Sequence, residues 1–279
     1  MATINVAAAA STENGLPQAI EDFEDVNNDK VNVTFDGSYT LANQIVYPLN
    51  NTYDVYLSAS DGEDEFGMGK VVLANKVYPQ PAPSPAPYPV DFIANNLVLI
   101  KNAAWVNYSG SPSLPTVESF ADVNNVKFPL SASSPNRHVW IANRDLAPAG
   151  MYANEALNLT SLGSWDDLVA KAIADGTLGS NVQTTLDGCI NDPVPAVGIV
   201  YWSDYYSAIN ASPAANITFV AYAPKTVNET IIYSAAVLTN AETHGVVSTA
   251  VDFVNFLLAN PSYFTAKGFR LLTDEAEGD

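Results

Sequence analysis

The sequence predicts an α/β protein built on parallel β-sheets. Short runs of apolar, β-forming residues alternate with helical patterns through the first half of the chain, an order typical of strands joined by crossover helices. The chain has 279 residues, and 48% of them are hydrophobic. It is therefore long enough and apolar enough to bury the core of two ordinary domains or of one large one.

The first half holds strands and helices up to a proline-rich stretch. They are expected at residues 4–9 (strand), 16–26 (helix), 31–35 (strand), 40–46 (helix) and 55–57 (strand). Pro17 predicts a late start for the first helix, because proline lacks an N–H and is tolerated only in the first turn. Residues 78–89 have proline at every second position from Pro79 onward. They cannot form a helix or a central strand, so we expect an extended surface excursion.

The second half continues the alternation. Its elements are expected at residues 92–100 (strand), 138–143 (strand), 148–159 (helix), 182–189 (helix), 196–202 (buried strand), 217–221 (strand), 231–238 (strand) and 246–258 (helix). Pro148 suits a first helical turn, and Pro261 follows the end of the last helix. The tail, residues 273–279, is acidic and is predicted to be disordered.

The charge balance excludes several classes of partner. The chain has 30 acidic and 11 basic residues, a net charge of −19 and a pI near 4.1. Nucleic acids and anionic membrane surfaces need clustered Lys and Arg, so neither is expected as a partner. Only 15% of residues are charged, which favours a periplasmic or extracellular protein whose export signal is absent from this chain. No apolar run approaches the length of a membrane span, so no membrane insertion is expected.

Neither cysteine nor clustered acidic residues predict a metal site. The single cysteine, Cys189, lies in no C-x-x-C motif and is expected to be a small buried apolar residue. The acidic run at residues 61–65 lacks the alternating ligand spacing of a calcium-binding EF-hand loop and predicts a solvated loop. We therefore expect no direct cation ligands and no cofactor.

No pattern predicts catalysis either. The chain lacks the G-x-S-x-G, H-E-x-x-H, Walker lysine-loop and G-x-G-x-x-G motifs. Its two histidines, His138 and His244, lie in different segments, and neither has a serine or cysteine partner in a recognisable turn. The sequence predicts a protein that is not an enzyme and has no catalytic residues.

Small-residue turns that lead into helices are the remaining candidates for a binding site. They lie at residues 9–12, 36–40, 148–150 and 180–182. The amino end of a helix has unpaired N–H groups and a partial positive charge, so several such ends can bind an anion without Lys or Arg. Ser11 and Ser38 would add hydroxyl donors. A single serine at such a place is more often an ordinary N-cap, so only the combination favours a binding site.

Several segments resemble the molybdate-binding proteins of bacterial ABC importers. Ala8-Ala-Ala-Ser-Thr-Glu-Asn-Gly-Leu16 is similar to the opening of that family, and Phe35-Asp-Gly-Ser-Tyr-Thr-Leu-Ala-Asn-Gln-Ile45 to its second ligand loop. Tyr53-Asp-Val-Tyr-Leu-Ser-Ala-Ser60 looks like the strand that follows. Further matching segments are residues 93–100, 148–157, 163–165, 198–204 and 264–269. The resemblance covers most of the chain in the family's order.

The resemblance implies a periplasmic-binding-protein type II fold. Such a fold has two lobes, each a mostly parallel sheet flanked by helices, with a ligand cleft between them that closes by a hinge motion. Carried onto this chain, lobe I would comprise residues 1–90 and 226–279, and lobe II residues 91–225. The chain would cross between the lobes twice, near residues 89–95 and 222–227.

The resemblance also implies a ligand and the residues that bind it. The ligand would be molybdate or tungstate, held by Ser11 and Ser38 from one lobe and by Ala149, Val182 and Tyr201 from the other. Ala149 and Val182 would donate backbone N–H groups, the two serines hydroxyl and backbone groups, and Tyr201 its phenol. The protein would be a monomer that serves a membrane ABC permease in uptake of the oxyanion.

Two other binding functions fit the same fold. Fewer neutral donors and a basic side chain in the site would favour a small carboxylate or phosphate ester, and Arg137 and Arg144 lie near the matched loops in sequence. A secreted binding or adhesion protein without a permease is favoured by the proline-rich stretch and by several Asn-x-Ser/Thr sequons.

Overall fold

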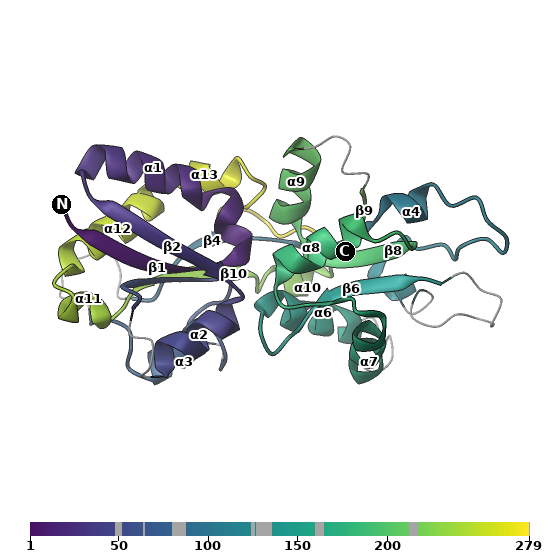
Figure 1. Cartoon of the computed structure of the whole chain (residues 1–279), viewed down its shortest axis with the longest axis horizontal. Helices are drawn as coiled ribbons and strands as arrows, with labels where there is room; N and C mark the ends of the chain where they lie inside the picture. The colour runs from purple at the N-terminus through teal and green to yellow at the C-terminus, as the bar shows by residue number, and fades with distance from the viewer. Residues whose placement is uncertain are drawn as a thin grey trace. The chain divides into compact units, whose positions relative to one another are not determined.

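The computed structural model divides the chain into two units, each an open β-sheet flanked by helices (Figure 1). It describes residues 1–47, 52–63, 65–79, 88–123, 126, 136–159, 165–211 and 217–278. Unit 1 comprises Met1–Ala94 and Ile232–Asp274, and unit 2 comprises Asn95–Ile231 and Glu275–Asp279. The predicted two-lobed α/β fold is confirmed. Most of the predicted proline-rich excursion at 78–89 lies outside the described residues.

The sheet of unit 1 has the strand order β2-β1-β3-β10-β4. Its strands are β1 (Thr3–Ala9), β2 (Lys30–Asp36), β3 (Val55–Ser58), β4 (Val90–Ala94) and β10 (Ile232–Val237). β1 pairs in parallel with β2 and β3, whereas β10 runs antiparallel to β3 and β4. Ala9 is paired with Asp36, and Ala8 with Leu57. The carboxyl ends of the three parallel strands therefore share one edge of the sheet.

Amphipathic helices cover both faces of this sheet. The helices of unit 1 are the 3₁₀ helix η1 (Ala10–Asn14), α1 (Leu16–Asn27), α2 (Ser38–Val46), α3 (Met68–Leu73), α11 (Asn240–Thr243), α12 (Val247–Ala259) and α13 (Ser262–Thr265). Figure 1 shows α2 and α3 on one face and α1 and α13 on the other. On α1, Leu16, Ala19 and Phe23 recur at helical spacing and are buried. The Phe23 ring meets Phe253 of α12 edge to face, with centroids 5.1 Å apart.

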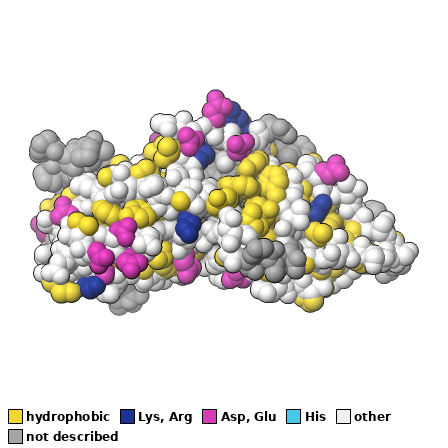
Figure 2. Space-filling view, turned by 90° about the horizontal axis from the view of Figure 1, so that it is seen from above, with side chains coloured by type: hydrophobic (Ala, Val, Ile, Leu, Met, Phe, Trp, Pro, Cys, Tyr) yellow, Lys and Arg dark blue, Asp and Glu magenta, His cyan; other side chains and the backbone are white. Residues whose placement is uncertain are grey.

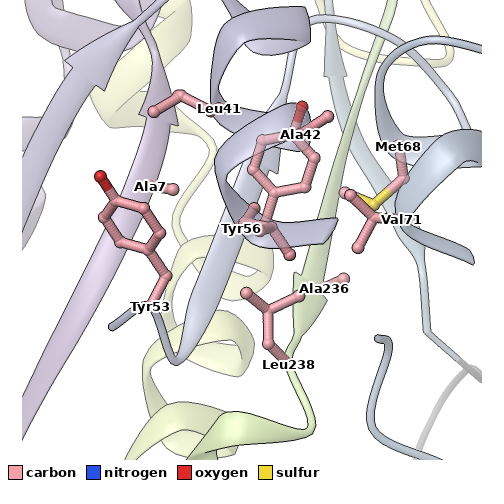
Figure 3. Close-up of a cluster of buried hydrophobic side chains, with 10 residues drawn as sticks. Ala7, Leu41, Ala42, Tyr53, Tyr56, Met68, Val71, Ala236 and Leu238 are labelled. Atoms are coloured by element: carbon pink, nitrogen blue, oxygen red, sulfur yellow. The ribbon is translucent and has the colours of Figure 1, made fainter. Parts of the chain in front are cut away.

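The core between α2, α3 and the sheet supports the amino end of α2. Its buried members are Ala7, Leu41, Ala42, Ile45, Tyr53, Tyr56, Met68, Val71, Ala236 and Leu238 (Figure 3). Leu41 and Ile45 lie one helical turn apart and are both buried. Burying a side chain of this size stabilises the fold by about 1.5–3 kcal/mol. α2 is therefore held firmly on the sheet.

The sheet of unit 2 has the strand order β7-β6-β8-β5-β9. Its strands are β5 (Leu97–Lys101), β6 (His138–Ala142), β7 (Leu178–Gly179), β8 (Ala196–Tyr201) and β9 (Thr218–Tyr222). β6 is parallel to β7 and to β8, whereas β5 is antiparallel to β8 and β9. The carboxyl ends of β7, β6 and β8 thus lie side by side at one edge.

Helices also flank the sheet of unit 2. They are α4 (Ala103–Val106), the 3₁₀ helix η2 (Phe120–Asp122), α6 (Pro148–Leu159), α7 (Trp165–Asp175), α8 (Val182–Asn191), α9 (Trp202–Ala211) and α10 (Lys225–Asn228). On α8 the buried positions are Val182, Thr185, Leu186 and Cys189, at the spacing of one helix face. Cys189 is fully buried, as predicted. None of the helices in the described ranges is long and apolar enough to span a membrane.

The prediction of a single strand at residues 92–100 is wrong. This segment forms parts of two strands, β4 and β5, which belong to different sheets. Asn95 and Asn96 interrupt the apolar run. Asn95 Oδ1 accepts a hydrogen bond from Asn96 N at 2.9 Å, and Asn95 Nδ2 donates to Ser203 Oγ at 2.8 Å. The Asn95 side chain thus bonds to residues of unit 2, whereas Ala94 still pairs with Ile232 in the sheet of unit 1. The chain passes between the units here, so unit 2 begins at Asn95 and not at the predicted residue 91.

The prediction of a disordered tail is also wrong for the described residues. Ala276 is buried, and Glu277 N donates to Asn96 Oδ1 at 3.3 Å. Asn228 Nδ2 donates to Glu277 O at 2.8 Å. Buried amide side chains need partners, and the tail backbone supplies them. The chain therefore enters unit 2 a second time at Glu275, which makes three passages between the units and not the predicted two.

Candidate functional site

Two buried serines lie at the carboxyl edge of the unit 1 sheet. Ser11 follows the end of β1, Ser38 follows the end of β2, and both are buried. Their strands are adjacent and in register at Ala9 and Asp36, so each serine is the second residue beyond a paired strand end. The structure thus places the two predicted serines at one edge. We call them the unit 1 donor group.

The hydroxyl proton of Ser38 can be donated to another group. Ala59 N donates a hydrogen bond to Ser38 Oγ at 3.0 Å, and a backbone N–H can only donate. Ser38 therefore uses its oxygen as an acceptor here, and its single proton is not needed for this bond. Ser38 is also the first residue of α2, where backbone N–H groups have no acceptor within the helix.

Ser11 lies in a 3₁₀ turn and not in α1. η1 separates it from α1, which begins at Leu16 with Pro17 in its first turn. The late helix start predicted from Pro17 is confirmed. Ser11 Oγ lies 2.7 Å from Tyr233 OH, and both side chains are buried. The macrodipole of α1 therefore acts one turn further along the chain, and Ser11 contributes mainly its hydroxyl and the local backbone.

A series of hydroxyl groups beside Ser38 was not predicted from the sequence. Tyr56 OH donates to Ser38 O at 2.7 Å and lies 3.2 Å from Ser58 Oγ. Ser58 Oγ lies 2.8 Å from Ser60 Oγ, which accepts from Met68 N at 3.3 Å. These contacts connect the end of β3 to the amino ends of α2 and α3. The Ser58-x-Ser60 spacing at the end of a strand was the available sequence signal.

The three residues predicted for the other lobe lie at the carboxyl edge of the unit 2 sheet. Ala149 is in the first turn of α6 after β6, Val182 is the first residue of α8 after β7, and Tyr201 is the last residue of β8. These strands are adjacent and parallel, so the three residues share one edge. All three are buried. We call them the unit 2 donor group.

Gly150 allows the first turn of α6 to approach the end of β6. A Cβ atom at this position would lie 2.4 Å from Ala142 O and 2.5 Å from Arg144 N, and both are backbone atoms that cannot easily move. Only glycine therefore fits here. The close approach places the Ala149 amide, in the first turn of α6, next to the strand end.

A capping box defines the start of α8. Asn181 Oδ1 accepts from Thr184 N at 2.9 Å, and Thr184 Oγ1 accepts from Asn181 N at 3.1 Å. The box satisfies the amide of the third helical residue. It does not use the amide of Val182, which belongs to the first turn, where no acceptor exists within the helix.

Tyr201 offers a phenol that carries no charge. It ends β8 opposite Leu97 of β5 and is almost completely buried. The next residue, Trp202, begins α9, and its amide donates to Asn96 O at 2.7 Å. The strand therefore ends one residue earlier than the predicted 196–202. The turn into α9 fixes the backbone of Tyr201 at the sheet edge.

Basic side chains are scarce around the donor groups. Arg137 precedes β6 and is buried at the opposite, amino edge of the sheet, where burial lowers the pKa of its guanidinium. Arg144 follows β6 at the carboxyl edge, but its side chain is 45% exposed and lies 3.9 Å from Asp145. On the face shown in Figure 2, Lys and Arg side chains are scattered and not clustered.

Both histidines lie at the amino edges of the sheets. His138 Nδ1 is 2.7 Å from Asp192 Oδ2, beside the starts of β6 and β8. His244 Nδ1 is 2.6 Å from Asp54 Oδ1, beside the start of β3. Neither imidazole is near a donor group. Among the residues that the structure describes, no three His, Cys, Asp or Glu side chains are placed to bind a metal ion.

The family comparison matches nearly the whole chain. Residues 4–270 fit the model of a family described as bacterial extracellular solute-binding protein. None of the curated proteins matches the sequence.

Solved structures with a similar fold bind several kinds of ligand. The periplasmic molybdate-binding protein of Azotobacter vinelandii is 19% identical with a TM-score of 0.67, and the match covers 96% of this chain and 99% of that one. The substrate-binding domain assigned to a molybdenum ABC transporter of Clostridium difficile is 21% identical with a TM-score of 0.57, covering 97% and 99%. A periplasmic binding protein of Actinobacillus pleuropneumoniae with bound fructose-6-phosphate is 15% identical with a TM-score of 0.68, covering 100% and 87%. Identities this low support the fold alone.

Proposed function

The chain belongs to the family of bacterial extracellular solute-binding proteins, and we propose that its solute is a small tetrahedral oxyanion, molybdate or tungstate. We propose the two serines of the unit 1 donor group and the three residues of the unit 2 donor group as the residues that bind it. We further propose that the protein works as a monomer outside the cytoplasm, delivers the oxyanion to an ABC permease and catalyses no reaction. The similar molybdate-binding and molybdenum-transporter proteins support this proposal.

The observation that carries the proposal is the neutrality of the donors. Ser11 and Ser38 offer hydroxyl groups, Ala149 and Val182 offer first-turn amides, and Tyr201 offers a phenol. A tetrahedral dianion has four acceptor oxygens and can use all of these groups. Helix amino ends stabilise such an anion through N–H groups and the helix dipole, without a cationic side chain.

Selectivity would then come from size and donor geometry. Molybdate and tungstate carry the same charge and shape as sulfate but are larger. A site of fixed donors on strand ends and helix starts cannot contract around a smaller anion without losing hydrogen bonds, and a buried donor without a partner is costly. We therefore expect tungstate and molybdate to bind more tightly than sulfate.

A second candidate ligand is a small phosphate ester or carboxylate. Arg144 is the observation that favours it, because this basic side chain follows β6 at the same edge as the unit 2 donor group. The similar protein with bound fructose-6-phosphate has the same fold. With such a ligand, Arg144→Gln should weaken binding, whereas molybdate binding should be unaffected by this variant.

Thermal unfolding with added anions tests the proposal. A ligand that binds only the folded state stabilises it by roughly 2.7 kcal/mol at 100 times its Kd, so the midpoint must rise. We expect a rise with molybdate and tungstate, and a much smaller one with sulfate, phosphate, citrate or fructose-6-phosphate. Titration calorimetry should then show Ser38→Ala binding molybdate about 10- to 100-fold more weakly, the loss of one hydrogen bond to a charged group.

Ser248→Ala is the matched control, because Ser248 is exposed on α12, away from the strand ends. It should bind molybdate as the unmodified protein does. A rise only with citrate or fructose-6-phosphate would move the function to the second candidate. No rise with any anion would disprove oxyanion binding.

A further inference from the structure

Tyr233 and Ser11 are in contact although 222 positions separate them in the sequence. Their hydroxyl oxygens are 2.7 Å apart, and both side chains are buried. Tyr233 lies on β10 of unit 1, where it pairs with Ile93 of β4. β10 is antiparallel to β3, and Ser234 pairs with Ser58, the last residue of β3. Tyr233 therefore lies at the same carboxyl edge of the sheet as the unit 1 donor group.

Aromatic packing fixes the Tyr233 ring. The ring meets Phe269 edge to face, with centroids 5.4 Å apart and an interplanar angle of 83°. Phe269 meets Phe264 of α13 in the same way, and Phe264 meets Phe92 of β4. Tyr233 itself has no exposed surface. Because the buried Tyr233 ring packs against Phe269, it cannot rotate away from Ser11. The fold therefore fixes the position of the Tyr233 hydroxyl relative to Ser11.

The direction of the hydrogen bond to Tyr233 determines whether Ser11 can donate its proton to a ligand. A serine hydroxyl has one proton and two acceptor positions. If Ser11 donated its proton to Tyr233, none would remain for a ligand. If Tyr233 donates instead, the Ser11 proton stays available. The phenol is the stronger acid of the two groups and therefore the better donor. Ser38 is in a comparable arrangement, because its Oγ accepts a hydrogen bond from Ala59 N and its own proton also stays available.

We propose that Tyr233 is a positioning residue for anion binding, which donates its O–H to Ser11 and so leaves the Ser11 proton for the ligand. The inference rests on the proposed function and extends it. Each serine of the unit 1 donor group then has one fixed donor directed at its oxygen, an amide for Ser38 and a phenol for Ser11. Both hydroxyls are thereby oriented as donors before the ligand arrives, which favours ligands whose oxygens only accept.

Titration calorimetry with molybdate on four proteins tests the inference: the unmodified chain, Tyr233→Phe, Ser11→Ala and the double variant. Tyr233→Phe keeps the ring against Phe269 and removes only the hydroxyl. It should weaken molybdate binding about 5- to 10-fold, the effect of losing one neutral hydrogen bond. Because Tyr233 acts through Ser11, the double variant should bind no more weakly than Ser11→Ala alone. A purely structural loss would instead appear in both backgrounds.

Tyr53→Phe is the matched control. Tyr53 is also a buried tyrosine of unit 1, and its hydroxyl donates to Gln44 Oε1 at 3.1 Å, at the other end of β3. Its removal should leave molybdate affinity unchanged. If Tyr233→Phe fails to fold, Phe269→Leu loosens the ring and keeps the hydroxyl. That variant should weaken binding by a smaller factor, and again only while Ser11 is present.

The possible outcomes separate the inference from the proposed function. Equal molybdate affinity in Tyr233→Phe and the unmodified protein overturns the inference and leaves the proposed function standing. A loss of the same size in the Ser11→Ala background also overturns it, because Tyr233 would then act independently of Ser11. If the unmodified protein binds neither molybdate nor tungstate, the proposed function fails and the inference fails with it.

Discussion

Asp54 and His244, 190 positions apart, are joined by a hydrogen bond between Oδ1 and Nδ1 that is 2.6 Å long. Asp54 is completely buried, and its Oδ2 accepts from Asn5 N at 2.8 Å. The Asp54 backbone also accepts from Leu238 N at 2.8 Å. One carboxylate therefore connects β1, the start of β3 and the turn after α11. It lies at the amino edge of the unit 1 sheet, away from the donor group.

Replacing this carboxylate should destabilise the protein without affecting the ligand. Asp54→Asn keeps the shape of the side chain but replaces one carboxylate oxygen with an N–H₂ group. This group would face either the Asn5 N–H or the His244 ring in place of an acceptor, so one of these hydrogen bonds is lost. We expect a loss of about 2–3 kcal/mol in the free energy of unfolding, measured with urea. Asp25→Asn, at an exposed position of α1, is the control and should unfold like the parent. An unchanged midpoint for Asp54→Asn would show that the pair contributes no stability.

Acid should weaken the junction between α1 and β2. The Glu24 carboxylate bonds to the Lys30 ammonium and accepts from Val31 N at 2.8 Å, and these bonds lower the pKa of Glu24. With a lowered folded pKa, the unfolded chain binds the proton first, so this stabilisation is complete above pH about 5 and is lost as the pH falls through the folded pKa. Glu24→Gln should be less stable than the parent at pH 7.

The stability difference between Glu24→Gln and the parent should shrink as the pH is lowered below about 4. Chemical unfolding at a series of pH values measures it. Glu21→Gln, at an exposed position of the same helix, provides the baseline. A difference that stays constant from pH 7 to pH 3 would contradict the assignment to the ionised carboxylate.

Local patterns were sufficient to predict most strands but not the passage between the units. β1, β2 and β3 are short apolar runs, and their predicted positions agree with the structure within a few residues. The run at residues 92–100 is equally apolar, yet it is two strands in two sheets. Asn95 and Asn96 were the visible signal. Their partners, Ser203 and Glu277, are far away in sequence, so the polar contacts could not be anticipated.

The same distinction applies to the candidate site. The turns that contain Ser11, Ser38, Ala149 and Val182, and the strand that ends near Tyr201, were predicted from sequence patterns, and the structure locates the five residues at strand ends and helix starts. Their role as ligands came from the resemblance and stays a prediction. The support around them was not predictable. Tyr233 comes from a strand near the other end of the chain, and its contact with Ser11 depends on how β10 enters the sheet. Sequence patterns identify positions on elements, whereas such contacts depend on the assembled sheet.

Gly150→Ala should impair the unit 2 donor group directly. The new methyl carbon would lie 2.4 Å from Ala142 O and 2.5 Å from Arg144 N, well inside van der Waals contact. The first turn of α6 must therefore move away from β6. Overpacking of this kind costs about 1–3 kcal/mol, and the displaced Ala149 amide should weaken molybdate binding at least tenfold. Glu155→Ala, exposed on the same helix, should change neither property. Unchanged affinity in Gly150→Ala would remove Ala149 from the site.

The Cys189 thiol should be unreactive in the folded protein. Burial raises its pKa, and Asp192 raises it further, so the thiolate that reacts with disulfide reagents is scarce. We expect no reaction with Ellman's reagent at pH 8 over an hour, and a full equivalent of thiol released after unfolding in urea. Ser248→Cys, which adds an exposed thiol, should react within minutes. Rapid modification of the unmodified protein would indicate that α8 opens away from β8.

The packing of the C-terminal tail on unit 2 depends on Asn228. This buried side chain accepts from Leu97 N at 2.7 Å and donates to Ala223 O and Glu277 O at 3.1 and 2.8 Å. A chain that ends at Asp274 loses the Glu277 acceptor and the bond to Asn96. We expect this truncation to lower the free energy of unfolding by about 1–2 kcal/mol, because the buried Asn228 amide loses its hydrogen bond to Glu277 O.

A chain that ends at Gly278 is the control for the truncation and should unfold like the parent, since both bonds of Glu277 remain. Asn228→Ala should cost more than the truncation, about 2–4 kcal/mol, because the bond from Leu97 is lost as well. In the Asn228→Ala background the truncation should have a smaller effect, since the two changes share the Glu277 bond. Strictly additive losses in urea unfolding would mean that the tail stabilises unit 2 by contacts other than Asn228.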